Sequence, residues 1–177
     1  MNVAHKVESV TPEEFEAMEK DERFNYELID GVVMMSPRPT KRHQRISLKL
    51  AKTIDDCLNE IDCDVYQEIE LDIDQNHIIP DLSIICDDND KSSAKQYTAP
   101  LIVIEILSPA TIQHDLIYKL NKYINLNIAE YWIIDPKIKM ITIHDFAHHN
   151  AATYGIGEII QSKARPEITI TVADIFN

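Results

Sequence analysis

The 177-residue chain lacks the features that mark a membrane protein, a zinc protein or a disulfide-rich protein. No apolar run approaches the roughly 18 residues of a membrane-spanning helix, and residues 1–15 lack the apolar core of a signal peptide. The cysteines Cys57, Cys63 and Cys86 show neither C-x-x-C nor C-x-x-H spacing, so we expect no disulfide framework and no zinc site. These absences favour a cytoplasmic protein whose cysteines are small buried residues.

Positive charge is also scarce. The chain has 17 Lys and Arg residues against 30 Asp and Glu residues, a net charge of −13. A protein that binds nucleic acid by neutralising phosphates normally carries a basic surface, so this balance argues against tight non-specific binding of DNA. It leaves room for a metal-dependent phosphodiesterase, because divalent cations bridge carboxylates to phosphate. Local cations such as Lys41 with Arg42, and Lys119 with Lys122, can contribute to such a site.

The remaining composition predicts one globular domain that spans residues 1–177. Hydrophobic residues make up 45% and charged residues 27% of the chain, which is ordinary for a sequence that buries a core, and no repeat or linker interrupts it. Apolar periodicity, turn residues and a capping box at Thr11 predict the elements. Helices are expected at 11–20, 40–60 and 112–127, a hairpin at 24–35 around Asp30-Gly31, strands at 65–73, 78–86, 101–107, 131–134, 137–146, 157–160 and 168–171, and a terminal turn at 172–176.

The most apolar stretch, LIVIEIL from Leu101 to Leu107, indicates a central strand covered on both faces. It contains one charge, Glu105. A buried carboxylate without a partner costs several kcal/mol, so Glu105 needs a metal ion, a lysine or a proton. Ser108-Pro109 ends the strand, because proline cannot donate a hydrogen bond to the ladder. Glu105 therefore lies near the carboxyl end of its strand, where sites in α/β sheets open.

Asp81, in the strand before it, can meet Glu105 if the two strands are neighbours. Two carboxylates with a main-chain carbonyl and water suit Mg²⁺ or Mn²⁺. Asp115, Lys119 and Tyr123 recur every four residues, so a helix places them on one face, from which the lysine can reach the strand end. A lysine there orients or deprotonates an attacking water and offsets charge on a phosphate. The structural alternative is that Asp81 caps a turn, Glu105 and Lys119 form a buried ion pair, and nothing reacts.

Several motifs resemble a known family in their order and spacing. They are YELIDG at 26–31, His43 after a proline-rich turn, PDLSII at 80–85, PLIVIEILSPAT at 100–111, the D-x-x-x-K-x-x-x-Y helix and AEYWIIDP at 129–136. Together they resemble the Uma-two family of putative restriction endonucleases, part of the PD-(D/E)XK nuclease superfamily, over about residues 26–146.

The resemblance implies an α/β (α+β) fold of restriction-endonuclease type, with a mixed sheet flanked by helices. It implies an endonuclease that hydrolyses DNA phosphodiester bonds with Mg²⁺ or Mn²⁺ held by Asp81 and Glu105. The superfamily's usual lysine position, two residues after the glutamate, holds Leu107 here. The resemblance therefore assigns the catalytic lysine to Lys119.

Four further residues follow from the same match as second-tier candidates. Glu27 and His43 correspond to the family's early glutamate and histidine, and Asp115 and Tyr123 accompany the lysine on its helix. The alternatives are a solvated hairpin carboxylate for Glu27 and a surface histidine for His43.

A second hypothesis of a different class stays open. The net charge of −13, Leu107 at the usual lysine position and the lack of a basic arm also fit a nuclease-like fold kept as a weakly active or inactive binding or scaffold module. The edge strands of the hairpin and of the C-terminal segment favour pairing with a second copy, so we expect a homodimer.

Overall fold

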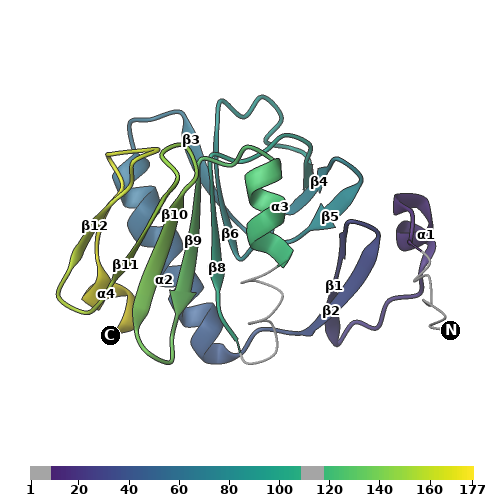
Figure 1. The fold of residues 1–177 in the computed structure, drawn as a ribbon, viewed down its shortest axis with the longest axis horizontal. Helices are drawn as coiled ribbons and strands as arrows, with labels where there is room; N and C mark the ends of the chain where they lie inside the picture. Colours follow the sequence, from purple (N-terminus) through teal and green to yellow (C-terminus); the bar gives the residue numbers. More distant parts are fainter. Residues whose placement is uncertain (1–8, 109–117) are drawn as a thin grey trace, which may run out of the picture.

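The computed structural model describes residues 9–108 and 118–177 of the chain. Within these residues, two larger sheets and a two-stranded sheet combine with four helices, which confirms the expected α+β class with mixed sheets (Figure 1). The helices are α1 (Pro12–Ala17), α2 (Lys41–Leu58), α3 (Leu120–Asn125) and α4 (Val172–Phe176).

The six-stranded sheet has the order β11-β10-β9-β8-β6-β3, the five-stranded sheet has the order β2-β1-β5-β4-β7, and β12 pairs with β13. Among the strands that the structure describes, only β8 with β9 and β4 with β7 run parallel. The strands are β1 (Phe24–Ile29), β2 (Val32–Pro37), β3 (Cys63–Gln67), β4 (Glu70–Ile73), β5 (Asn76–Ile78), β6 (Leu82–Cys86), β7 (Lys95–Gln96), β8 (Ile102–Ile106), β9 (Glu130–Asp135), β10 (Met140–Asp145), β11 (Asn150–Tyr154), β12 (Ile159–Gln161) and β13 (Thr169–Thr171).

Strand β8 is the centre of the fold, and every residue in it is buried. Its side chains alternate between the two faces of the sheet. On one face its isoleucines join a core with the apolar stripe of α2. On the other face Val103 packs in a second core with Tyr123 of α3. The prediction of a central strand covered on both faces is therefore confirmed. The residues of the first core that β8 and α2 contribute are Ile102, Ile104, Ile106, Ile46, Leu50, Ile54 and Leu58.

Local signals form the N-terminal elements as expected. Thr11 and Glu14 make the reciprocal hydrogen bonds of a capping box, at 3.2 Å and 2.9 Å, and Pro12 opens α1. Asp30 and Gly31 both have positive φ, 50° and 76°, as a two-residue hairpin turn between β1 and β2 requires. Helix α2 begins after Thr40, whose side chain accepts a hydrogen bond from the His43 amide.

Two strand predictions are wrong, because each predicted strand is divided between the two sheets. The expected strand 65–73 breaks at Glu68, which adopts a left-handed φ of 51° and separates β3 from β4. The expected strand 78–86 breaks between β5 and β6 at Pro80, which has no amide hydrogen to donate. Both breaks fall beside the candidate site, and they allow the chain to leave one sheet and enter the other there.

Smaller departures concern short elements. The sequence analysis did not predict β7, which consists of two polar residues, or β11, which contains no Val, Ile or Leu, and residues 172–176 form the short helix α4 rather than a turn. For the helix expected at 112–127, the structure describes α3 at its carboxyl end. The segment 112–117, with Asp115, lies outside the described residues.

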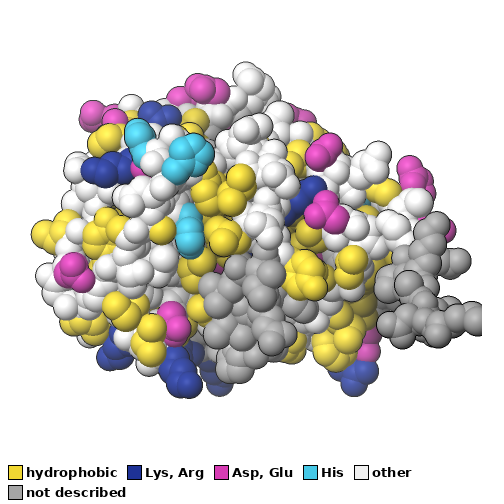
Figure 2. Space-filling view, in the orientation of Figure 1, with side chains coloured by type: hydrophobic (Ala, Val, Ile, Leu, Met, Phe, Trp, Pro, Cys, Tyr) yellow, Lys and Arg dark blue, Asp and Glu magenta, His cyan; other side chains and the backbone are white. Residues whose placement is uncertain are grey.

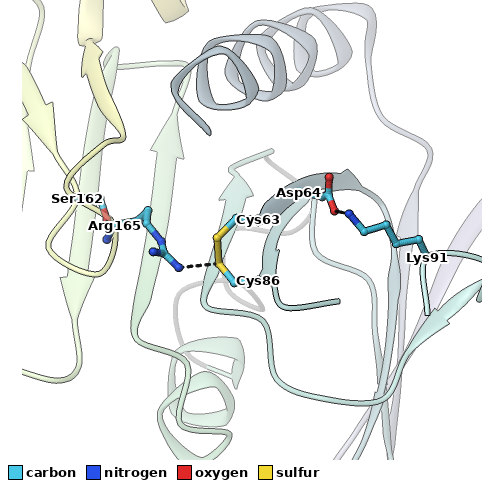
Figure 3. The surroundings of a disulfide bond; sticks show 6 residues. All are labelled: Cys63, Asp64, Cys86, Lys91, Ser162 and Arg165. Atoms are coloured by element: carbon cyan, nitrogen blue, oxygen red, sulfur yellow. Dashed lines mark hydrogen bonds and ion pairs between the residues drawn. A yellow bond between two sulfur atoms is a disulfide. The ribbon is translucent and has the colours of Figure 1, made fainter. Parts of the chain in front are cut away.

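The expectation that the cysteines are unpaired is wrong. Cys63 of β3 and Cys86 of β6 are directly opposite in the antiparallel ladder and form a disulfide with an S–S distance of 2.03 Å (Figure 3). Arg165 donates from Nη2 to Cys86 Sγ at 3.1 Å. The strand register, which no cysteine spacing reveals, brings the two thiols together. Cys57 alone among the cysteines is free.

The surface charge is unevenly distributed. In the view of Figure 2, several Lys and Arg side chains lie along the lower edge, including the part below the lower end of α2 and the β9–β10 turn, with others at the upper left and right of centre, and Asp and Glu are scattered over the face. Among the helices that the structure describes, none is both long and apolar enough to cross a membrane.

Candidate active site

A cavity of about 210 Å³ lies where the β1–β2 hairpin, the start of α2 and the carboxyl end of β8 meet. Five residues singled out in the sequence line it together, although they come from five segments spread over more than ninety positions of the chain. These five are Glu27, His43, Asp81, Glu105 and Lys119.

Glu105 lies on β8 with only 3% of its surface exposed, and it has the cationic partner that its burial requires. Its Oε1 accepts hydrogen bonds from Lys119 Nζ at 2.9 Å and from the Tyr123 hydroxyl at 2.7 Å. Lys119 and Tyr123 thus share a helix face, as their four-residue spacing predicts. Burial, together with the charge of Glu105, raises the pKa of Tyr123 well above its usual value, so its hydroxyl remains a donor at neutral pH.

Asp81 is brought to Glu105 by the register of two neighbouring strands. Strands β6 and β8 are antiparallel with Leu82 opposite Ile104, and the next pair in this register is Asp81 with Glu105. Residues directly opposite in an antiparallel pair point to the same face. Asp81 Oδ2 accepts a hydrogen bond from the Ile106 amide at 2.6 Å, which fixes the carboxylate beside the end of β8.

His43 contacts the other side of the Asp81 carboxylate, with Nε2 3.1 Å from Oδ2. It lies in the first turn of α2, and its ring is partly buried. Burial lowers the pKa of His43, but the hydrogen bond and charge of Asp81, together with the charge of Glu68, outweigh burial and raise it. His43 is therefore a member of the cavity wall rather than the surface histidine of the alternative interpretation.

Glu27 of β1 completes the group, and it is buried rather than solvated, with 8% of its surface exposed. Its Oε1 accepts from the Ile79 amide at 2.8 Å and lies 2.9 Å from Lys119 Nζ. The Lys119 ammonium thus bridges Glu27 and Glu105. This bridge joins the five-stranded sheet to the six-stranded sheet through the site.

The structure shows where Leu107, Lys119 and Lys122 lie relative to Glu105. Leu107, at the superfamily's usual lysine position, packs against the second core, and the ammonium beside the strand glutamate comes from Lys119. Lys122 points away from this face and pairs with Asp30 at 2.8 Å in the β1–β2 turn.

The sequence analysis did not identify Glu68, Arg38 or Asn25, which also line the cavity. No pattern in the sequence marks them. Glu68 reaches the site only because the chain changes sheets there, where its amide donates to the Asp81 carbonyl at 3.2 Å.

A second group of potential metal ligands consists of Glu16 of α1, Glu70 of β4 and His77 of β5. Lys95 pairs with its two carboxylates, with Nζ 2.5 Å from Glu16 Oε1 and 3.1 Å from Glu70 Oε1. Burial lowers the pKa of Lys95, but its hydrogen bonds to these two carboxylates outweigh burial and raise it, so the ammonium persists. Lys95 therefore supplies positive charge to the two carboxylates of this group.

The cavity itself has the donor set and the charge that suit a divalent cation. Its charged lining residues are four carboxylates, Glu27, Glu68, Asp81 and Glu105, against two permanent cations, Arg38 and Lys119, which leaves a charge of −2 when His43 is neutral. Carboxylate oxygens are the ligands that Mg²⁺ and Mn²⁺ prefer, and one carboxylate can accept about four interactions. Asp81 and Glu105 therefore offer the kind of oxygen ligand that such an ion takes.

Comparisons with known proteins bear on the fold and the family of the chain. A crystal structure from Anabaena variabilis, described as a putative nuclease belonging to DUF820, superposes with a TM-score of 0.81 over 94% of this chain and 97% of its own, at 19% sequence identity. An uncharacterized protein of Synechocystis sp. is 32% identical over 109 residues, which are 60% of this chain and 57% of that protein.

The chain thus matches little more than half the length of the Synechocystis protein. By contrast, the family Uma2, described as "Putative restriction endonuclease", matches residues 12–173, which include every described residue of the cavity wall. The chain therefore belongs to the Uma2 family.

Proposed function

We propose that the protein is a divalent-metal-dependent endonuclease that hydrolyses phosphodiester bonds in DNA. The observation that carries this proposal is the convergence of Asp81, Glu105 and Lys119 on one acidic cavity from three separate elements. Membership of a family described as restriction endonucleases, and a structural neighbour described as a nuclease, support the same class of reaction.

In this proposal Asp81 and Glu105 hold Mg²⁺ or Mn²⁺. When bound, such an ion lowers the pKa of a coordinated water and polarises a phosphate oxygen. Three neighbouring groups orient these two carboxylates. The Ile106 amide and His43 fix Asp81, and Tyr123 fixes Glu105.

Lys119 has two functions in the proposed mechanism. Its ammonium neutralises part of the charge of Glu27 and Glu105, which offsets the cost of burying the two carboxylates. Held on the cavity wall, it also lies where negative charge accumulates on a phosphate under attack, and a preorganised cation stabilises that charge more than water does. Because Lys119 is buried and held by Glu27 and Glu105, its side chain needs little rearrangement when substrate binds.

The direct test is cleavage of labelled duplex DNA, supercoiled plasmid and RNA with Mg²⁺, Mn²⁺ or a chelator. We expect metal-dependent cleavage of DNA that is lost in Asp81→Asn and in Glu105→Gln. The exposed Asp55→Asn and Glu167→Gln make the same chemical changes away from the cavity and should retain activity. Cleavage that survives both cavity substitutions would refute the assignment.

The scaffold hypothesis makes a different prediction, and the buried Lys119–Glu105 ion pair is the observation in its favour. A scaffold with an ion pair that serves only stability should cleave nothing and bind no stoichiometric Mn²⁺. Metal binding by the wild type that disappears in Asp81→Asn would exclude it.

A further inference from the structure

We infer that an exposed basic strip beside the cavity binds the phosphate backbone of double-stranded DNA and presents it to the site. The basic strip consists of Arg38, Lys41, Arg42, Arg45, Lys137 and Lys139. This inference rests on the proposed function, because it names the surface that would hold the substrate of that site.

The first observation is the local composition. Residues 36–54 contain no Asp or Glu and six of the 17 Lys and Arg residues, in a chain whose net charge is −13. A stretch that contains only positive charges creates a local positive potential in an otherwise acidic protein. The remaining, negatively charged surface repels a polyanion. A nucleic acid that approaches the molecule is therefore directed to this face.

The second observation is where the strip lies relative to the cavity. Arg38 lines the cavity and donates to the Glu22 carbonyl and to Asn25, which holds it at the entrance. Lys41 and Arg45 follow on the exposed face of α2, about 6 Å apart along the helix axis. The helix thus carries the positive charge outward from the cavity.

The β9–β10 turn extends the same surface. Arg42 donates to the carbonyl of Pro136, so this turn lies against the start of α2. Lys137 and Lys139 in the turn are exposed. The gathering of Lys and Arg along the lower edge of Figure 2 lies below the lower end of α2 and this turn.

The third observation is that folding does not account for these cations. Within the part of the chain that the structure describes, the side chains of Lys41, Arg45, Lys137 and Lys139 have no ion-pair or hydrogen-bond partner. The first turn of α2 holds cations and no acid, which opposes the helix dipole, whereas α1 has Glu13 and Glu14 in its first turn. The strip therefore carries unneutralised charge that an external polyanion would balance.

The chemistry of the strip favours duplex DNA over a single strand. Proteins that hold single strands combine cations with aromatic side chains on which bases stack, and the stretches that carry the strip, residues 36–54 and 135–139, contain no Phe, Tyr or Trp. Arginine and lysine alone contact the backbone and position a duplex without reading its sequence. We therefore expect the strip to supply affinity and orientation rather than sequence preference.

The test is fluorescence anisotropy of a labelled DNA duplex with Mg²⁺, in an Asp81→Asn background that blocks cleavage. We compare the background protein, the strip variant Lys41→Gln/Arg45→Gln, and the matched control Lys91→Gln/Lys163→Gln, whose exposed lysines lie outside the strip. The strip variant should bind several-fold more weakly, and its slope of log K against log salt should be shallower by about two. The control should keep the affinity and slope of the background protein.

Equal losses in the strip variant and the control, or no loss in the strip variant, would overturn the inference. So would a single strand that binds as tightly as the duplex. Circular dichroism melting of each variant separates loss of binding from loss of folding. Because binding is measured without cleavage, the test of the strip is independent of the test of the nuclease assignment. If the nuclease assignment is wrong, the wild type binds the duplex and does not cut it.

Discussion

Two buried glutamates on neighbouring parallel strands, Glu105 of β8 and Glu130 of β9, show how differently the same side chain can be used. Glu130 is 1% exposed and accepts four hydrogen bonds, all from neutral donors. Glu105 is 3% exposed, contacts a lysine ammonium, and lies on a cavity wall. The donors to Glu130 are Trp132 Nε1, Ser162 Oγ and the amides of Lys163 and Ala164.

The difference lies in the charge of the groups that contact each carboxylate. Four donors fill the acceptor positions of the Glu130 carboxylate, and three of them come from residues 162–164, so this glutamate attaches the C-terminal segment to the sheet. Glu105 shares its lysine with a second carboxylate, Glu27, in an acidic cavity. Burial alone thus does not identify a functional carboxylate. What distinguishes Glu105 from Glu130 is its cationic partner and its place on a cavity wall.

The largest effects should come from exchanging each glutamate for glutamine. In Glu105→Gln we expect cleavage to fall by at least about 10²-fold, because the side chain can no longer bind a metal as an anion. In Glu130→Gln we expect the free energy of unfolding to fall by about 3 kcal/mol, because an amide NH₂ would face N–H donors. Urea unfolding and cleavage assays on both variants measure the two effects separately.

Ser162→Ala offers a milder check on the structural glutamate. It removes a single donor to Glu130 and should lower stability by about 1 kcal/mol without loss of cleavage. If Ser162→Ala or Glu130→Gln abolished cleavage while the protein remained folded, the division of roles between the two glutamates would be wrong.

Lys119→Ala should also abolish cleavage, with a loss of at least about 10²-fold, because it removes the cation closest to the two carboxylates. Mn²⁺ binding should remain or become tighter, since the lysine opposes the ion electrostatically. Calorimetry and cleavage on the same preparation measure both. Adding Glu27→Gln removes one of the two carboxylates left without the lysine and should restore part of the stability, but not the activity.

Lys122→Ala is the matched control, because this lysine lies one helix face away and pairs with Asp30. It should lower stability and keep cleavage. An active Lys119→Ala together with an inactive Lys122→Ala would require the site to be reassigned.

The Cys63–Cys86 disulfide lies at the opposite end of β6 from Asp81 and should affect stability alone. It closes a loop with a sequence separation of 23, for which removal typically costs about 3 kcal/mol. Cys63→Ser/Cys86→Ser should therefore unfold at lower urea concentration and cleave at the wild-type rate under native conditions. A matched loss of cleavage in the folded variant would show that the two ends of β6 are coupled.

The smallest effect concerns pH. Because the folded-state pKa of His43 is raised above its ordinary value of 6.5, its contribution to stability is fully present below that value and is lost as pH rises through the folded-state pKa. His43→Gln should therefore lose more stability relative to wild type at about pH 6 than at about pH 9. A difference that grows with rising pH would contradict the His43–Asp81 interaction.

Local patterns in the sequence predicted much of the site. The spacing of Lys119 and Tyr123 predicts a shared helix face, and the apolar run around Glu105 predicts its need for a partner, because both depend on residues a few positions apart. The β1–β2 turn at Asp30-Gly31 was predictable for the same reason.

Features that depend on strand pairing and tertiary packing could not be predicted from the sequence. The register of β3 and β6 decides that Cys63 meets Cys86, and three of the four donors to Glu130 come from more than thirty residues away. The left-handed conformation of Glu68 divides a seemingly continuous strand between two sheets. None of these has a local signature, since each is fixed by tertiary packing.

Titration of Mn²⁺ by calorimetry tests most directly whether the Glu105 cavity, and not another acidic group, is the metal-dependent centre. The titration compares the wild type with Glu105→Gln, Glu130→Gln and Glu16→Gln. The last of these alters the second acidic group, in which Glu16 pairs with Lys95. We predict stoichiometric binding in the wild type, Glu130→Gln and Glu16→Gln, and its loss in Glu105→Gln. Unchanged binding in Glu105→Gln, or loss only in Glu16→Gln, would contradict the assignment of the cavity.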